Sequence, residues 1–133
     1  MLGRLNHVAI AVTDLKSATN TYRDILGAKV GEPLDQPEHG VTVVFIELPN
    51  TKVELITPLG ENSPIFNFLN KNKNGGIHHM CYEVKNLELS INILMKNNYK
   101  IIGDNPKIGA HGKPVIFLHP SGFDGTLIEL QEE

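Results

Sequence analysis

The sequence predicts an α+β fold in which two βαβββ modules form an open, eight-stranded, cup-like mixed sheet with helices outside. Each half of the chain places a histidine early in an apolar, β-prone run that ends at a helix-start signal. A shift of 72 positions superposes His7 on His79 and the run 43–46 on 115–118. A shift of 75 superposes Glu54 on Glu129, as expected if the second copy has a turn three residues longer. Self-similarity at a fixed period indicates a duplicated module.

Length and composition limit the classes of protein to consider. The chain has 133 residues and is 41% hydrophobic, which is enough for the core of one ordinary domain. We expect a single domain over 1–133, with one module at about 5–69, a linker at 70–76 and a second module at about 77–131. A net charge of −3 argues against nucleic acid as the main partner. No apolar run approaches membrane-spanning length.

The single cysteine bears on the compartment. Cys81 excludes an intrachain disulfide and a cysteine-rich zinc site, and it fits a reducing environment. The first predicted strand starts within a few residues of Met1, so we expect no signal peptide. We therefore expect a cytoplasmic protein, or one of the mitochondrial matrix if a transit peptide has been removed.

The first module begins with a predicted strand over 5–12. Asp14 is a suitable N-cap for a helix from Leu15 to Leu26, and Gly27 is a suitable stop. Ser63 and Pro64 can start a short helix that ends near Leu69. The segments between these helices are predicted as a short strand (28–31), a loop (32–40) and a β-hairpin (41–48 and 52–57).

The second module repeats this order. We expect a strand over 77–84, a helix over 87–97 and a short strand over 99–102. A loop over 103–112 and a last hairpin, 113–119 and 126–131, complete the module.

Two histidines and two glutamates occupy matching places in the copies. His7 and His79 lie in equivalent first strands, and Glu54 and Glu129 lie in equivalent last strands with apolar neighbours. A carboxylate in such a run either points to solvent or is buried with a partner, because burying it alone is costly. Two imidazoles and two carboxylates suit a divalent cation such as Co²⁺, Mn²⁺, Ni²⁺, Zn²⁺ or Mg²⁺. A single glutamate in a strand usually faces solvent, and a single histidine in a strand is usually a packed or surface residue. The presence of both residue types at matching places in the two copies favours a metal site.

The remaining histidines and the cysteine have weaker interpretations. His78 is expected to pack on the face opposite His79, and His39 and His119 are expected in solvent. His111 lies in a glycine-rich segment, where a ligand-covering loop and an ordinary turn are equally open. Cys81 shares the face of His79, and a small buried side chain is its expected role.

Several short motifs resemble one enzyme family. They are the segments 37–41, 51–55, 58–60, 63–65, 76–79, 109–113 and 127–130, which read PEHGV, TKVEL, PLG, SPI, GIHH, GAHGK and LIEL. Together with the duplicated His and Glu pattern they resemble the methylmalonyl-CoA epimerase family of the vicinal oxygen chelate superfamily. The matches run in order over nearly the whole chain.

The resemblance implies a function and a set of site residues. It implies one divalent ion, Co²⁺ first among the candidates, bound by His7, Glu54, His79 and Glu129. It implies interconversion of (2R)- and (2S)-methylmalonyl-CoA through a metal-stabilised enolate, with Glu129 as a catalytic base at C2. It also implies an acyl-CoA substrate and a homodimer. Lys52, Lys107 and Lys113 are the only hints of a site for the CoA tail.

The sequence departs from the family pattern at two positions. Val43 stands where some family members have a glutamate taken as the second base, so Glu47, Glu54 or a metal-bound water is left for that role. Ser121 stands where many members have a lysine.

Three other functions are open. A glyoxalase I-type isomerase uses a similar ligand set, an extradiol dioxygenase would leave Glu54 without a role, and a metal-free ligand-binding protein would need none of the four ligands.

Overall fold

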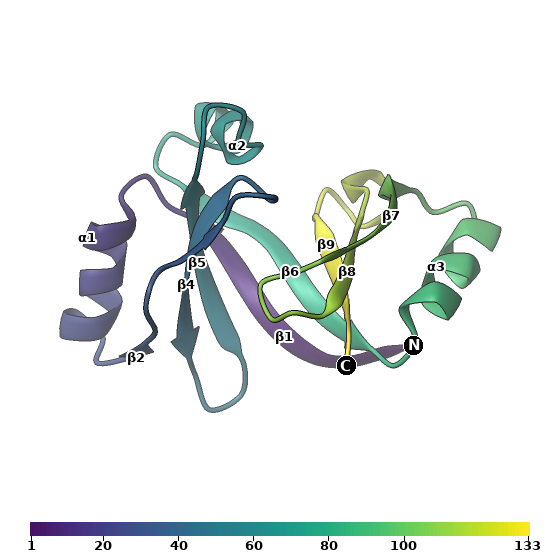
Figure 1. Cartoon of the computed structure of the whole chain (residues 1–133), viewed down its shortest axis with the longest axis horizontal. Helices are drawn as coiled ribbons and strands as arrows, with labels where there is room; N and C mark the ends of the chain where they lie inside the picture. Colours follow the sequence, from purple (N-terminus) through teal and green to yellow (C-terminus); the bar gives the residue numbers. More distant parts are fainter. The chain divides into compact units, whose positions relative to one another are not determined.

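The computed structural model describes residues 1–133, which form nine strands and three α-helices (Figure 1). The chain divides into two compact units, one of residues 7–78 and the other of residues 1–6 with 79–133. Strands β1 (Leu2–Ala11) and β6 (Gly76–Val84) contribute residues to both units. The nine strands and three α-helices form an α+β fold, as predicted.

The unit of residues 7–78 contains an open mixed sheet. Its strands follow the order β2-β4-β5-β1, and β3 pairs with β4 at the side. β1 and β5 are parallel, whereas β4 is antiparallel to β2, β3 and β5. The bounds are β2 (Lys29–Val30), β3 (Leu34–Gln36), β4 (Val41–Glu47) and β5 (Lys52–Pro58).

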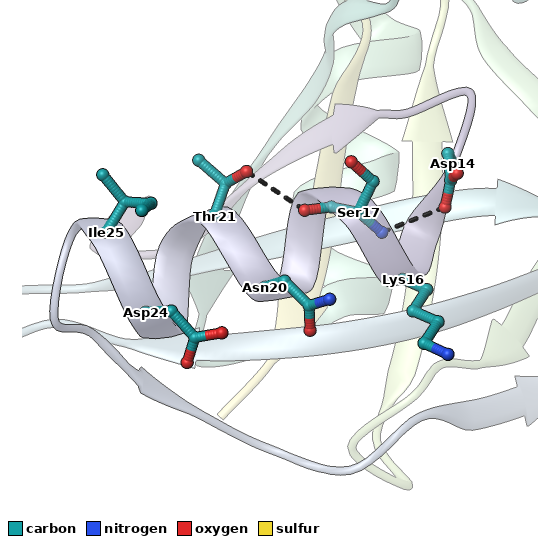
Figure 2. A pocket seen from close by; sticks show the side chains of 7 residues that line it. All are labelled: Asp14, Lys16, Ser17, Asn20, Thr21, Asp24 and Ile25. Carbon is teal, nitrogen blue, oxygen red and sulfur yellow. Dashed lines mark hydrogen bonds between the residues drawn. The ribbon is translucent and has the colours of Figure 1, made fainter.

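Helices cover both faces of this sheet. α1 (Leu15–Asn20) and the π-helical turn η1 (Thr21–Ile25) pack with Val44, Ile46 and Leu55. α2 (Ile65–Lys71) packs on the other face through Ile65 and Phe68. Asp14 caps α1 by accepting a hydrogen bond from the Ser17 backbone, as predicted, and the Thr21 hydroxyl donates to the Ser17 carbonyl (Figure 2).

The other unit repeats the arrangement. Its strands follow the order β6-β9-β8-β7, with β6 and β9 parallel and the other two pairs antiparallel. α3 (Leu87–Lys96) starts at the N-cap Asn86 and packs with Val84, Ile116 and Leu130. The remaining bounds are β7 (Ile101–Ile108), β8 (Pro114–Leu118), a 3-10 turn η2 (Pro120–Gly122) and β9 (Ile128–Glu132).

Two predicted loops need correction, because each contains a strand. The sheet strands number nine, not eight, because the turn at 37–40 folds β3 back onto β4 within the predicted loop. The predicted loop 103–112 is largely strand β7, whose pairing with β8 shifts between Ile102 and Lys107. That irregularity accommodates Gly103, at φ +81°, and Pro106. Pairing resumes at Lys107, so loop-type residues lie inside a strand.

The first helix also differs from its prediction. It is α-helical only to Asn20, because Leu26 N donates to Thr21 O, five residues back. Gly27, at φ +66°, then ends the helix in the left-handed conformation, as predicted.

The duplication explains the spacing of the last hairpins. Phe45 faces Glu54 nine residues later, whereas Phe117 faces Glu129 twelve residues later. The second hairpin is thus longer by the predicted three residues. None of the helices combines the length and the hydropathy needed to cross a membrane.

Candidate metal centre

The unit of residues 7–78 contains one buried histidine–glutamate pair. His7 lies on β1, and Glu54 lies on the parallel neighbour β5, directly opposite Ala9. His7 Nε2 and Glu54 Oε2 are 3.5 Å apart, and their side chains are only 3% and 8% exposed. Two positions predicted as metal ligands therefore share one buried location.

The other unit contains the equivalent pair. His79 lies on β6, and Glu129 lies on the parallel neighbour β9, directly opposite Cys81. His79 Nε2 and Glu129 Oε2 are 3.0 Å apart, and these side chains are also almost completely buried. The second copy thus reproduces the pair with a shorter separation.

The burial of these two pairs limits the chemistry that their side chains can support. Removing a carboxylate from water is costly unless a partner compensates it, and each glutamate has an imidazole nitrogen as that partner. Imidazole nitrogen and carboxylate oxygen are also the donors that Co²⁺, Zn²⁺, Ni²⁺ and Mn²⁺ accept. The chemistry of each pair therefore fits a divalent cation.

Each pair is accompanied by a phenylalanine that sequence reasoning did not single out. Phe45 lies opposite Glu54 on β4, and its ring centroid is 5.9 Å from that of His7 at an interplanar angle of 76°. Phe117 lies opposite Glu129 on β8, 5.2 Å from the His79 ring at 87°. The 72-residue shift already superposed Phe45 on Phe117, and that was the available signal.

Comparisons with known proteins agree with this duplicated arrangement. The sequence profile of the glyoxalase/bleomycin resistance protein/dioxygenase superfamily matches residues 6–117. The chain belongs to this superfamily.

Relatives within the superfamily carry more specific names. The ethylmalonyl-CoA/methylmalonyl-CoA epimerase of Cereibacter sphaeroides is 59% identical over 133 residues, 99% of each chain. The mitochondrial methylmalonyl-CoA epimerase of Bos taurus is 57% identical over 98% of this chain and 75% of its own length. A solved methylmalonyl-CoA epimerase in complex with methylmalonyl-CoA and NH4+ has a TM-score of 0.92 at 26% identity, covering 100% of this chain and 96% of that one.

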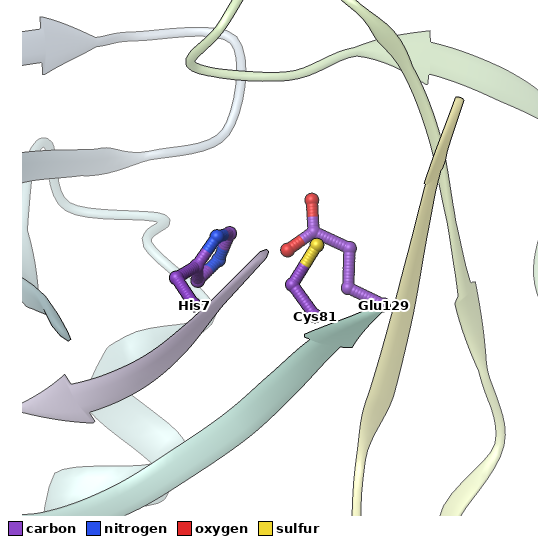
Figure 3. Close-up of side chains that lie close together, drawn as sticks. All are labelled: His7, Cys81 and Glu129. Atoms are coloured by element: carbon purple, nitrogen blue, oxygen red, sulfur yellow. The ribbon is translucent and has the colours of Figure 1, made fainter. Parts of the chain in front are cut away.

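Two further residues, Cys81 and Gly109, lie next to Glu129. Cys81 is fully buried and lies beside Glu129 (Figure 3). In the first copy, Ala9 has the equivalent position opposite Glu54. A Cβ added at Gly109 would lie 2.9 Å from Val115 Cγ1 and 3.7 Å from Glu129 Oε1. The backbone of the predicted loop 103–112 therefore passes close to the Glu129 carboxylate, and a side chain at position 109 would require Val115 to shift.

Substituting Gly109 tests this close approach. We expect Gly109→Ala to lower the free energy of unfolding by about 1–3 kcal/mol, because Val115 must move to accept the methyl group. Urea unfolding measures the effect. Gly31→Ala is the matched control, since its Cβ would meet only the Phe45 carbonyl oxygen at 3.4 Å. Equal stability of the two variants would contradict the close packing.

Val43, which stands where some family members have a second base, and the candidate Glu47 lie in different surroundings. Val43 is buried among Ala9, Ala11 and Ile56, so it contributes an apolar wall. Glu47 is exposed at the end of β4, as its position suggested.

The other predicted residues are placed as follows. His78 packs against Phe68 with centroids 5.1 Å apart. His119 is exposed, as expected, whereas His39, in the turn between β3 and β4, is half-buried rather than in solvent. His111, Lys107, Lys113 and Ser121 are exposed, and Lys52 is half-buried.

A separate hollow lies on the outer surface of α1 and η1 (Figure 2). It contains none of the predicted site residues. Asp24, at its rim, accepts a hydrogen bond from Arg23 that lowers the pKa of the Asp24 carboxyl. The lining residues are Asp14, Lys16, Ser17, Asn20, Thr21, Asp24 and Ile25.

Proposed function

We propose that this protein is a methylmalonyl-CoA epimerase, which interconverts the (2R) and (2S) forms of methylmalonyl-CoA. The observation that carries the proposal is the duplicated, buried histidine–glutamate pair. The 59% identity to a named epimerase over 99% of both chains supports the same substrate class.

We further propose that one domain over residues 1–133 binds one divalent ion, Co²⁺ first among the candidates, through both pairs. The ligands are His7, Glu54, His79 and Glu129. Two neutral imidazoles and two carboxylates together carry two negative charges, which a divalent cation neutralises. When bound, the ion supplies Lewis-acid stabilisation of negative charge on the substrate oxygens.

Glu129 is proposed as a catalytic base that takes the proton from C2. Its Oε2 faces His79, and its Oε1 is the oxygen nearest Gly109, so the two oxygens have different neighbours. Inversion requires a second group that returns a proton on the opposite face of C2. Among the side-chain candidates, Val43 has no titratable group and Glu47 is exposed at a strand end. Glu54, a buried carboxylate, is our candidate for that role.

The proposal includes the assembly and the compartment. We propose a homodimer, in the cytoplasm or in the mitochondrial matrix. The mitochondrial relatives and the bacterial one are consistent with either compartment.

Substrate comparison tests the function against its main rival. Purified protein is incubated with (2S)-methylmalonyl-CoA or with the hemithioacetal of methylglyoxal and glutathione, and the products are separated by chromatography. We expect formation of the (2R) thioester and no conversion of the hemithioacetal. The reverse pattern would assign a glyoxalase-type isomerase instead.

A further inference from the structure

The two copies share a third residue besides histidine and glutamate. Phe45 and Phe117 stand directly across the strand pair from Glu54 and Glu129, and each ring meets the imidazole nearly perpendicularly. Perpendicular contacts are a favoured geometry for aromatic rings. The repeated element is therefore a triplet of histidine, glutamate and phenylalanine.

The orientation of an imidazole ring depends on the contacts around it. Rotation about the Cβ–Cγ bond of histidine is soft, so the backbone alone does not select the ring orientation. A half-turn about that bond places Cε1 where Nε2 was. The glutamate oxygen meets the ring at Nε2, and the perpendicular phenylalanine opposes rotation of the ring plane.

We propose that Phe45 and Phe117 are positioning residues that hold the His7 and His79 rings with Nε2 directed for metal binding. The inference rests on the proposed function, and it adds that the two copies are unequal. In the second copy the ring centroids are 5.2 Å apart rather than 5.9 Å, and Nε2 lies 3.0 Å rather than 3.5 Å from the carboxylate. Phe117 therefore restrains its histidine more strongly than Phe45 does.

The chain offers a matched control for ring removal. Phe68 makes a similar contact, 5.1 Å at 74°, with His78, which is not among the proposed ligands. Replacing Phe68 by leucine removes the same kind of contact from a histidine outside the proposed metal site.

The first test measures the affinity for Co²⁺ alone by calorimetric titration of the chelated protein. We expect Phe117→Leu to weaken binding about tenfold and Phe45→Leu about threefold, because misoriented ligands bind less well. We expect Phe68→Leu to bind as the wild type does. Phe117→Tyr keeps the ring and should retain wild-type affinity. If Phe117 only fills space, leucine should replace it adequately, because leucine also fills the space with apolar atoms. The leucine and tyrosine variants would then bind Co²⁺ with equal affinity, which would contradict the proposal.

The second test needs no metal, so it separates this inference from the proposed function. Order parameters of the His79 ring C–H bonds are measured by NMR relaxation in chelated protein. They should fall in Phe117→Leu and stay unchanged in Phe117→Tyr and Phe68→Leu. Unchanged ring order in Phe117→Leu would overturn the inference even if the wild type binds Co²⁺. Failure of the wild type to bind Co²⁺, with the ring-order result as expected, would overturn only the metal assignment.

Discussion

Replacing Glu129 by glutamine is expected to lower the epimerisation rate about a thousandfold. The amide has nearly the same shape as the carboxylate, but it can neither accept the C2 proton nor supply negative charge. Glu129 is 7% exposed, and its Oε2 lies 3.0 Å from His79 Nε2. Bulk water therefore has little access to this position and does not compensate for the loss of the carboxylate. The rate is measured with methylmalonyl-CoA at saturating concentration.

Glu47→Gln is the control for this substitution. It makes the same chemical change on the exposed end of β4, and its rate should stay within about twofold of the wild type. A Glu129→Gln enzyme that turns over as fast as this control would remove Glu129 from the mechanism.

Removing divalent ions is expected to abolish turnover and to lower the melting temperature by about 10 °C. A ligand that binds only the folded state at 100 times its dissociation constant stabilises it by about 2.7 kcal/mol, and about 4 °C per kcal/mol is typical near this chain length. Scanning calorimetry of chelated protein, before and after addition of Co²⁺, measures the shift. Calorimetric titration should give one ion per chain, since both pairs are proposed to share it.

His79→Ala is the control for metal removal. This variant lacks one proposed ligand, so added Co²⁺ should shift its melting temperature little. A binding ratio of two ions per chain would mean that each histidine–glutamate pair binds its own ion, and it would contradict a shared site.

Much of the fold and of the candidate site was predictable because the chain repeats itself. The 72-residue shift aligned His7 with His79, and the longer turn of the second copy explained the later position of Glu129. The structure then shows both glutamates buried against their histidines, which separates them from solvent-facing strand glutamates.

Other features depend on geometry that the sequence does not encode locally. β3 and the second half of β7 contain residues typical of loops, and cross-strand pairing overrides that local preference. The close approach at Gly109 depends on where Val115 and Glu129 lie in the folded chain. The role of Phe117 depends on the strand register that places it opposite Glu129. The amino-acid composition indicates neither the close approach at Gly109 nor the position of Phe117.

The central claim is that this protein moves the C2 proton of methylmalonyl-CoA in a metal-dependent reaction. Proton NMR in D2O tests it directly, with chelated protein and with the same protein after addition of Co²⁺. We predict that deuterium enters C2 with inversion only in the Co²⁺ sample. Exchange at the same rate without metal would contradict the metal site, and no exchange in either sample would contradict the epimerase function.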